Sequence, residues 1–397
     1  MAVTASSGEQ HLRRALVDAV LGDRCRAEHA VGALRLCDEA AVLALATRCG
    51  VLGHLAVRAG DAWPAAQERS RWAHMRSVLL LHATAAAFRV FTDAEIEAVA
   101  IKGIGVIALL GAAAPERTTS DIDVVVRPRD AGAALRILRE ADFRDLDEPF
   151  ERHVAQIASS VELHNFARTL RRGDVDIDLH WRFGPSPPYA LDPSRLLARA
   201  VSSSIGADRI RVADPVDAIL IAVHHALRLS FDITGTLRDL ADLRRWWEQR
   251  EVRERAEELV ERAVCSELAP ALIALCNVLV ARDPSHDICS LADRLEARLE
   301  RSERSEAARL LTYVEPALEG ELPTRFTRAI FTPGLYLRSL VAELRTTAHS
   351  TARVQRPSLA RRLVRLPTRI GRVVRELAHL RRLGGYCALA RAQRRFH

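Results

Sequence analysis

The stretch SDIDVVV, residues 120–126, alternates polar and apolar side chains before it ends in three valines. This alternation predicts a buried β-strand on which Asp121 and Asp123 share one face, while Ile122 and Val124 share the other. Two carboxylates so close together repel each other, and a divalent cation between them would remove that repulsion. Because Mg²⁺ prefers carboxylate and phosphate oxygens, we predict that Asp121 and Asp123 are metal ligands. The alternative is a pair of solvated aspartates on an edge strand.

A second stretch with the same alternation, VDIDLHW, occupies residues 175–181. On a strand, its polar residues Asp176, Asp178 and His180 would share one face. If this strand lies beside the first, Asp178 becomes a third carboxylate that binds metal and deprotonates or orients an attacking hydroxyl. Asp176 and His180 would then surround the ligands, with His180 hydrogen-bonded to Asp178. The alternative is a hairpin with one solvated face.

Only one of the 58 basic residues is a lysine, and it precedes a glycine as Lys102-Gly103. The other 57 are arginines, which is typical of a GC-rich bacterial genome. A lysine kept against this bias suggests a position that requires a compact ammonium group, although chance survival is the alternative. Gly103 would let the backbone approach a ligand closely, and the following helix N-terminus would offer N–H groups to a phosphate. Arg117 and Ser120, just before Asp121, are further candidate nucleotide contacts.

The catalytic core is expected at residues 98–188, where the pattern indicates a strand, a helix, a strand, a helix and then a pair of strands. The expected pair is SSVELHNF and VDIDLHWRF, joined by a turn in ARTLRRGD. Helical periodicity dominates residues 1–97 and 189–349, and a proline-rich segment marks the second boundary. Residues 350–397 form a basic tail. We therefore predict an α+β fold in which a small mixed sheet is flanked by N- and C-terminal helical domains.

Together, the motifs K-G, R-x-x-x-D-I-D-h-h-V and D-I-D-L-H-W resemble the bacterial uncharacterised nucleotidyltransferase family, a branch of the DNA polymerase β-like superfamily. The resemblance covers residues 98–183. It implies that Asp121 and Asp123 hold two Mg²⁺ ions that bridge nucleotide phosphates, and that Asp178 takes the third-carboxylate position. It also implies that Lys102, with the glycine after it, stands where the superfamily has its Gly-Ser phosphate-binding turn.

Two features depart from the superfamily pattern and bear on the substrate class. The turn lacks a serine, so a hydroxyl contact to phosphate is missing, and Asp121 lies 18 positions after Gly103, more than is usual. H-H-A at residues 224–226 and D-L-A at residues 239–241 match the family more loosely and serve as landmarks of the helical domain.

The activity that the resemblance implies is transfer of an NMP from an NTP to a hydroxyl of a small molecule, peptide or protein. Pyrophosphate would leave, neutralised by metal, Lys102 and Arg117. One alternative is a non-catalytic nucleotide-binding scaffold or partner protein with a vestigial site, and another is a toxin-type nucleotidyltransferase that modifies tRNA. The intact set of Asp121, Asp123 and Asp178 argues against a vestigial site.

Composition excludes several other classes of protein. Hydrophobic residues make up 49% of the chain and charged residues 27%, as in a globular protein rather than a disordered one. No apolar run reaches the roughly 18 residues of a membrane span, and no export signal is visible, so we expect a cytoplasmic protein that is not integral to a membrane. The seven cysteines are scattered and odd in number, which predicts neither a disulfide framework nor a zinc site.

The basic tail, residues 351–397, contains 13 arginines, one glutamate and no aspartate. Its net charge is +12, which leaves −5 on the rest of the chain. Its leucines, with Ile370 and Val373, recur every three or four residues, so a basic amphipathic helix is predicted. Such a helix suits an anionic membrane surface, nucleic acid or an acidic carrier peptide, or it docks on the acidic body. The absence of a recognisable nucleic-acid-binding module argues against nucleic acid.

Overall fold

The fold is known from a computed structural model. It describes residues 7–111, 116–146, 167–183, 191–228 and 231–320. The basic tail and the expected strand SSVELHNF both lie outside the described residues.

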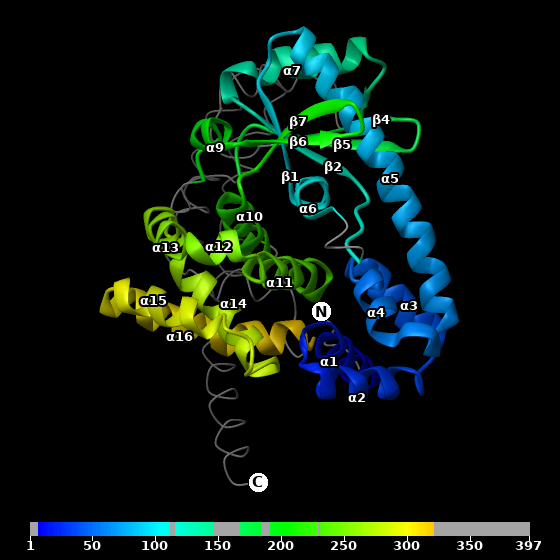
Figure 1. Ribbon diagram of the computed structural model, residues 1–397, viewed down its shortest axis with the longest axis vertical. Helices are drawn as coiled ribbons and strands as arrows, with labels where there is room; N and C mark the ends of the chain where they lie inside the picture. Colours follow the sequence, from blue (N-terminus) through cyan, green and yellow to red (C-terminus); the bar gives the residue numbers. More distant parts are fainter. Residues whose placement is uncertain (1–6, 112–115, 147–166, 184–190, 229–230, 321–397) are drawn as a thin grey trace, which may run out of the picture.

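A seven-stranded mixed sheet forms the centre of the molecule (Figure 1). Its spatial order is β3-β4-β5-β2-β1-β7-β6. The β2–β5 and β1–β7 pairs are parallel, and the other neighbours are antiparallel. The strands are β1 (Ala98–Ile101), β2 (Ile122–Val126), β3 (Arg144–Asp145), β4 (Ala167–Arg172), β5 (Val175–His180), β6 (Val201–Ile205) and β7 (Asp208–Val212). The predicted α+β fold with a mixed sheet is confirmed.

Strands β3, β4, β6 and β7 lie where the sequence did not indicate a strand. Strand β4 occupies most of the segment expected to be a turn, and the turn itself is confined to Gly173 and Asp174. Gly173 has a φ of 58°, the left-handed backbone that glycine adopts without strain. Strands β6 and β7 follow the proline-rich segment, so the sheet extends past residue 188 into the region expected to be helical.

Two helices cover the apolar face of the central strands. Ile122 and Val124 of β2 pack in one buried cluster with Phe88 and Leu135. These two residues belong to α5 (Pro64–Asp93) and α7 (Ala131–Glu140), the second of which follows η3 (Pro128–Asp130). The expected division of β2 into two faces is therefore confirmed, because Val125 packs in a different cluster.

The N-terminal and C-terminal helices share one hydrophobic core, which also includes Val125. The N-terminal group is α1 (Ser7–Leu21), α2 (Arg24–Leu34), α3 (Glu39–Arg48), α4 (Leu52–Ala59) and η1 (Gly60–Ala62). The C-terminal group is α9 (Pro193–Arg199), α10 (Pro215–Arg228), α11 (Ile233–Trp247), α12 (Arg250–Glu254), α13 (Ala256–Cys265), α14 (Ala269–Arg282), α15 (Cys289–Arg298) and α16 (Arg301–Leu318). Helix α5 runs from the N-terminal group to the sheet (Figure 1). Among the described helices, none is both long and apolar enough to cross a membrane.

Aspartate side chains fix the starts of several helices. The carboxylate of Asp38 accepts a hydrogen bond from the N–H of Ala41 at the start of α3, and Asp232 accepts one from Thr234 at the start of α11. Such caps satisfy backbone donors that have no partner within the helix. Asp232 thereby fixes where α11 begins, and α11 is the helix that faces the carboxylates described next.

Candidate active site

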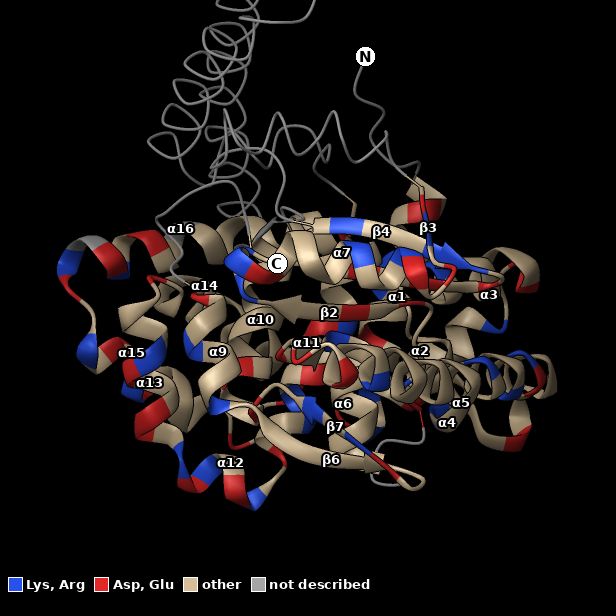
Figure 2. Cartoon of the chain, turned by 90° about the horizontal axis from the view of Figure 1, so that it is seen from above, with Lys and Arg blue, Asp and Glu red and all other residues tan. Residues whose placement is uncertain are grey.

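The two aspartate-bearing strands, β2 and β5, lie side by side in the middle of the sheet. They are parallel, and Asp123 stands opposite Asp178 in their register. Oxygen atoms of these two carboxylates and a ring nitrogen of His180 lie within 4.8 Å of one another. Figure 2 shows acidic residues on β2 and on α11, in the interior of the molecule. The three side chains form what we call the carboxylate cluster.

Asp123 is the most enclosed member of the carboxylate cluster, with 4% of its surface exposed. The Lys102 ammonium donates a hydrogen bond to its Oδ1 at 2.6 Å, and Nε2 of His180 lies 2.8 Å from the same oxygen. Burial alone would raise the pKa of the Asp123 carboxyl, but Lys102 and His180 together hold this pKa well below its usual range. Asp123 is therefore an anion at physiological pH.

His180 contacts Asp123 rather than Asp178, the partner expected from the sequence. Burial lowers the pKa of His180, although the hydrogen bond to Asp123 acts in the opposite direction. A neutral ring would donate Nε2–H to the carboxylate, which assigns His180 to holding Asp123 in place. The tryptophan that follows, Trp181, is buried with the apolar residues of β5.

Asp178 has a different supporting contact. The hydroxyl of Thr169 donates a hydrogen bond to its Oδ1 at 2.6 Å, from the position directly opposite on β4. Because the sequence indicated a turn at this segment, Thr169 was not among the expected site residues. Asp178 remains partly exposed, so one side of its carboxyl group is open to a ligand.

Asp121 lies immediately before β2 and is partly exposed. It does not belong to the group within 4.8 Å, but burial and the charges of Asp123 and Asp178 raise its pKa. Three carboxylates therefore share one region of negative potential. Among the groups that affect the pKa of Asp121 most, Lys102 and Arg238 are the two cations that lower it. The neighbouring Ser120 is exposed, and its hydroxyl lies 3.5 Å from Oδ1 of Asp121.

The turn between β1 and α6 (Lys102–Leu110) brings Lys102 beside the carboxylates. Lys102 has a φ of 51°, a left-handed conformation that is uncommon for a residue with a side chain. A side chain at Gly103 would place its Cβ 2.3 Å from Oγ1 of Thr119. Thr119 in turn contacts the backbone carbonyl of Asp121. The glycine thus permits the close approach of α6 to the segment that leads into β2.

Two of the expected site residues have other partners. Arg117 is 2% exposed and forms a two-pronged ion pair with Asp242 of α11, at 2.7 Å and 2.9 Å. Asp176 forms a similar pair with Arg171 on β4, and this hydrogen bond lowers the pKa of Asp176. The structure therefore places Arg117 and Asp176 in ion pairs with other side chains, outside the carboxylate cluster.

Arg238, on α11, is a cation near the site that the sequence did not single out. Burial would lower its pKa, but the charges of Asp239, Asp242, Asp121 and Asp123 raise it. Its Nε atom is buried and has no hydrogen-bond partner among the described residues. No motif marks one arginine among 57, so only the fold reveals that α11 brings Arg238 toward the aspartates.

The donor atoms of the carboxylate cluster fit a divalent metal. Asp123 and Asp178 offer oxygen atoms, which hard cations such as Mg²⁺ prefer. Burial raises the pKa of Asp121 most, and the neighbouring charge of Asp123 raises it further. A metal held by Asp123 and Asp178, with Asp121 at its open side, would balance that charge.

Comparison with known proteins gives the family. The model of the uncharacterised nucleotidyltransferase family matches residues 32–281, which include the carboxylate cluster, α4 and α11. The chain belongs to this family. It is therefore a transferase of the nucleotidyltransferase type. The match also joins parts of both helical groups to the sheet as one family unit.

Solved structures show a fainter likeness. The solution structure of the antibiotic-resistance factor ANT(2'')-Ia matches with 14% identity and a TM-score of 0.32, over 47% of this chain and 93% of that one. Its crystal structure with adenylyl-2''-tobramycin gives 16% identity and the same TM-score, over 47% and 95%. A nucleotidyltransferase-like protein from Paracoccidioides brasiliensis matches with 14% identity and a TM-score of 0.28, over 48% and 91%. No match was found among curated proteins.

Proposed function

We propose that this nucleotidyltransferase is Mg²⁺-dependent and transfers an NMP from an NTP to a hydroxyl of a small molecule, peptide or protein. The observation that carries the proposal is the pairing of Asp123 with Asp178 across two parallel strands, with Lys102 beside them. In the proposed reaction the acceptor oxygen bonds to the α-phosphorus, the bond to the β-phosphate bridging oxygen breaks, and pyrophosphate leaves with that oxygen.

Asp123 and Asp178 would hold the metal, and Asp121 would complete the acidic set. When bound, Mg²⁺ would neutralise phosphate charge and lower the pKa of a nearby hydroxyl. His180 keeps Asp123 oriented through the hydrogen bond to Oδ1. Thr169 does the same for Asp178. The open side of the Asp178 carboxylate would orient the acceptor hydroxyl and accept its proton.

The phosphates have cationic partners on both sides of the carboxylates. Lys102 begins α6, so its ammonium and the free N–H groups of that helix end would bind the β- and γ-phosphates. Arg238 of α11 supplies a second cation from the helical side, with an Nε–H that has no other described acceptor. Arg117 is assigned a structural role because Asp242 already engages its guanidinium.

Binding of the four NTPs, measured by calorimetry with and without Mg²⁺, tests the proposal. We expect binding that requires metal and that is lost in Asp121→Asn/Asp123→Asn, together with transfer reduced by at least about 100-fold. Asp178→Asn should reduce transfer more than binding. Asp176→Asn is the matched control, because it removes a carboxylate on the same strand that lies outside the cluster.

Three results would contradict the proposal. Transfer that persists in the Asp121→Asn/Asp123→Asn variant would mean that these aspartates do not hold the metal. Binding of NTP without any transfer to small molecules, peptides, proteins or tRNA would favour the scaffold alternative, and labelling of tRNA would favour the toxin-type alternative.

A further inference from the structure

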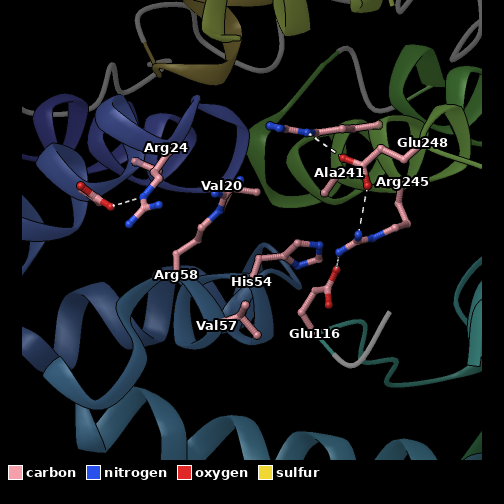
Figure 3. A pocket seen from close by; sticks show the side chains of 12 residues that line it. Val20, Arg24, His54, Val57, Arg58, Glu116, Ala241, Arg245 and Glu248 are labelled. Carbon is pink, nitrogen blue, oxygen red and sulfur yellow. Dashed lines mark hydrogen bonds and ion pairs between the residues drawn. The ribbon is translucent and has the colours of Figure 1, made fainter. Parts of the chain in front are cut away.

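A cavity of about 390 Å³ lies among the N-terminal helices, α11 and the loop that carries Glu116 (Figure 3). Its volume is within the range of about 300–1,000 Å³ that is typical of small-molecule sites. Three glutamates are among its lining residues, but the arginines outnumber them. These are Arg24, Arg58, Arg244 and Arg245.

Three of these arginines already have anionic partners. Arg245 forms an ion pair with Glu116, Arg244 binds Asp283 at 2.7 Å, and Arg24 binds a glutamate one turn along its own helix at 2.8 Å. Figure 3 shows such pairs as dashed lines within the pocket. The charges of these three arginines are therefore balanced by the protein itself.

Arg58 differs from the other three. In the described part of the chain, its guanidinium has no hydrogen bond or ion pair, and no dashed line reaches it in Figure 3. Burial and the positive charge of Arg244 lower the pKa of Arg58, and the carboxylates of Glu248 and Asp283 act in the opposite direction. Arg58 is an exposed residue of α4, so its guanidinium is open to an anion that enters the pocket.

His54 lies on the same face of α4, one helical turn before Arg58. Its Nδ1 atom is buried and has no hydrogen-bond partner among the described residues. Burial, with Arg117 and Arg245 nearby, lowers the pKa of His54 to about 3. The ring is therefore neutral at physiological pH, and it has a ring nitrogen available for a ligand.

We propose that this pocket binds a phosphate-type anion carried by a small molecule, with Arg58 and His54 as its ligands. The guanidinium would donate two parallel hydrogen bonds to the anion's oxygens, and Nδ1–H of His54 would donate a third. The cavity is larger than phosphate alone requires, so the anion is expected to be one end of a larger compound. The inference does not depend on the proposed transfer reaction.

The pocket is separate from the proposed nucleotide site. Glu116 lines the pocket, but the next residue, Arg117, is 2% exposed and joined to Asp242. This buried pair lies between the pocket and the carboxylate cluster along α11, where Asp242 stands between Arg238 and Arg245. The triphosphate bound beside Lys102 would therefore not occupy both places.

Binding of inorganic phosphate, followed by ³¹P NMR line broadening, tests the proposal on the full chain. We expect saturable binding that weakens by about tenfold or more in Arg58→Gln, as the loss of a charge-assisted hydrogen bond implies. Arg58→Lys should recover part of the affinity, because it keeps the charge but loses the two-pronged geometry. Phosphate should also shift the ¹⁵N resonances of the His54 ring.

Two control variants identify where the phosphate binds. Arg48→Gln removes the same charge from an exposed position on α3 and should leave the affinity unchanged. Lys102→Met removes the cation of the proposed nucleotide site and should leave unchanged the part of the phosphate binding that Arg58→Gln weakens. Affinity lost in Lys102→Met and kept in Arg58→Gln would overturn the inference, because the phosphate would then be at the carboxylate cluster. Absence of saturable binding to the wild-type protein would overturn it as well.

Discussion

Breaking the buried ion pair between Arg117 and Asp242 should destabilise the protein strongly. Both side chains are almost fully enclosed, at 2% and 7% exposed, and their two hydrogen bonds join the segment before β2 to α11. Removal of one partner leaves the other charge buried without a counterion, which typically costs about 3–5 kcal/mol. We therefore expect Arg117→Met to lower the free energy of unfolding by about that amount, measured by urea denaturation with far-ultraviolet circular dichroism.

The double variant Arg117→Met/Asp242→Leu should recover a large part of this loss. With both charged groups replaced by apolar side chains, no unpaired charge remains in the interior, and a coupling energy of at least about 2 kcal/mol is expected between the two sites. Burial already raises the pKa of Asp242, with Arg117 acting against it. Without Arg117 this carboxyl should take up a proton more readily, so the destabilisation of Arg117→Met should diminish at acidic pH.

The same variants decide between two roles for Arg117. Arg250→Met removes an arginine from an exposed pair on the surface and should leave stability essentially unchanged. If Arg117→Met were no more destabilising than Arg250→Met, the structural role would be refuted. Loss of NTP affinity at unchanged stability would instead support the phosphate contact that the sequence suggested for Arg117.

Three further perturbations have defined outcomes. Gly103→Ala would bring a methyl group within 2.3 Å of Oγ1 of Thr119, so we expect about 1–3 kcal/mol of destabilisation and slower transfer. Normal activity together with normal stability would contradict the close approach of α6 to this threonine. Lys102→Arg should retain the fold but lose most NTP affinity, because a guanidinium is larger than the ammonium that lies 2.6 Å from the buried carboxylate of β2. The folded-state pKa of His54, about 3, is below its unfolded value, so the stability from burying the neutral ring is complete above about pH 6.5 and is lost as pH falls toward 3. In His54→Gln, the free energy of unfolding should therefore decrease less steeply between about pH 6.5 and 4.5, by up to about 1.4 kcal/mol per pH unit. The control His29→Gln replaces an exposed histidine and should leave this slope unchanged.

The sequence was sufficient to predict the two faces of the central strands. Polar and apolar residues alternate with a period of two in both, so the division into a carboxylate face and an apolar face follows from strand geometry alone. The prediction that β5 lies beside β2 came from the resemblance to the family, because pairing between distant strands leaves no local signal. The register that sets Asp123 opposite Asp178 is likewise known only from the structure.

The partners of charged residues were harder to predict. Arg117 is four residues from Asp121 in sequence, which suggested a shared role, but its partner Asp242 lies 125 residues further along the chain. His180 was expected to contact Asp178, two residues away on the same strand, whereas it contacts Asp123 on the neighbouring strand. Contacts across strands and between domains depend on packing, to which spacing along the chain gives no guide.

Strands with polar sequences were also missed. Strand β6 contains three consecutive serines, and β7 alternates charged and apolar residues over only five positions. Strand β4 has a single large apolar residue, Leu170, and is stabilised by pairing with β5 along its whole length. For these segments tertiary pairing outweighs local propensity.

The parallel pairing of β2 with β5 has a consequence for how this enzyme can change. The separation of the two carboxylates is set by main-chain hydrogen bonds between adjacent strands, about 4.8 Å apart, and not by the side chains around them. A slip of one residue in either strand would turn an aspartate into the hydrophobic interior and bring an isoleucine, a valine or a leucine to the carboxylate face. Such a slip would therefore cost folding energy and, on the proposed function, catalysis as well. The surrounding helices are free of this double constraint, so substitutions that alter acceptor choice should be tolerated there far more readily than in the two strands.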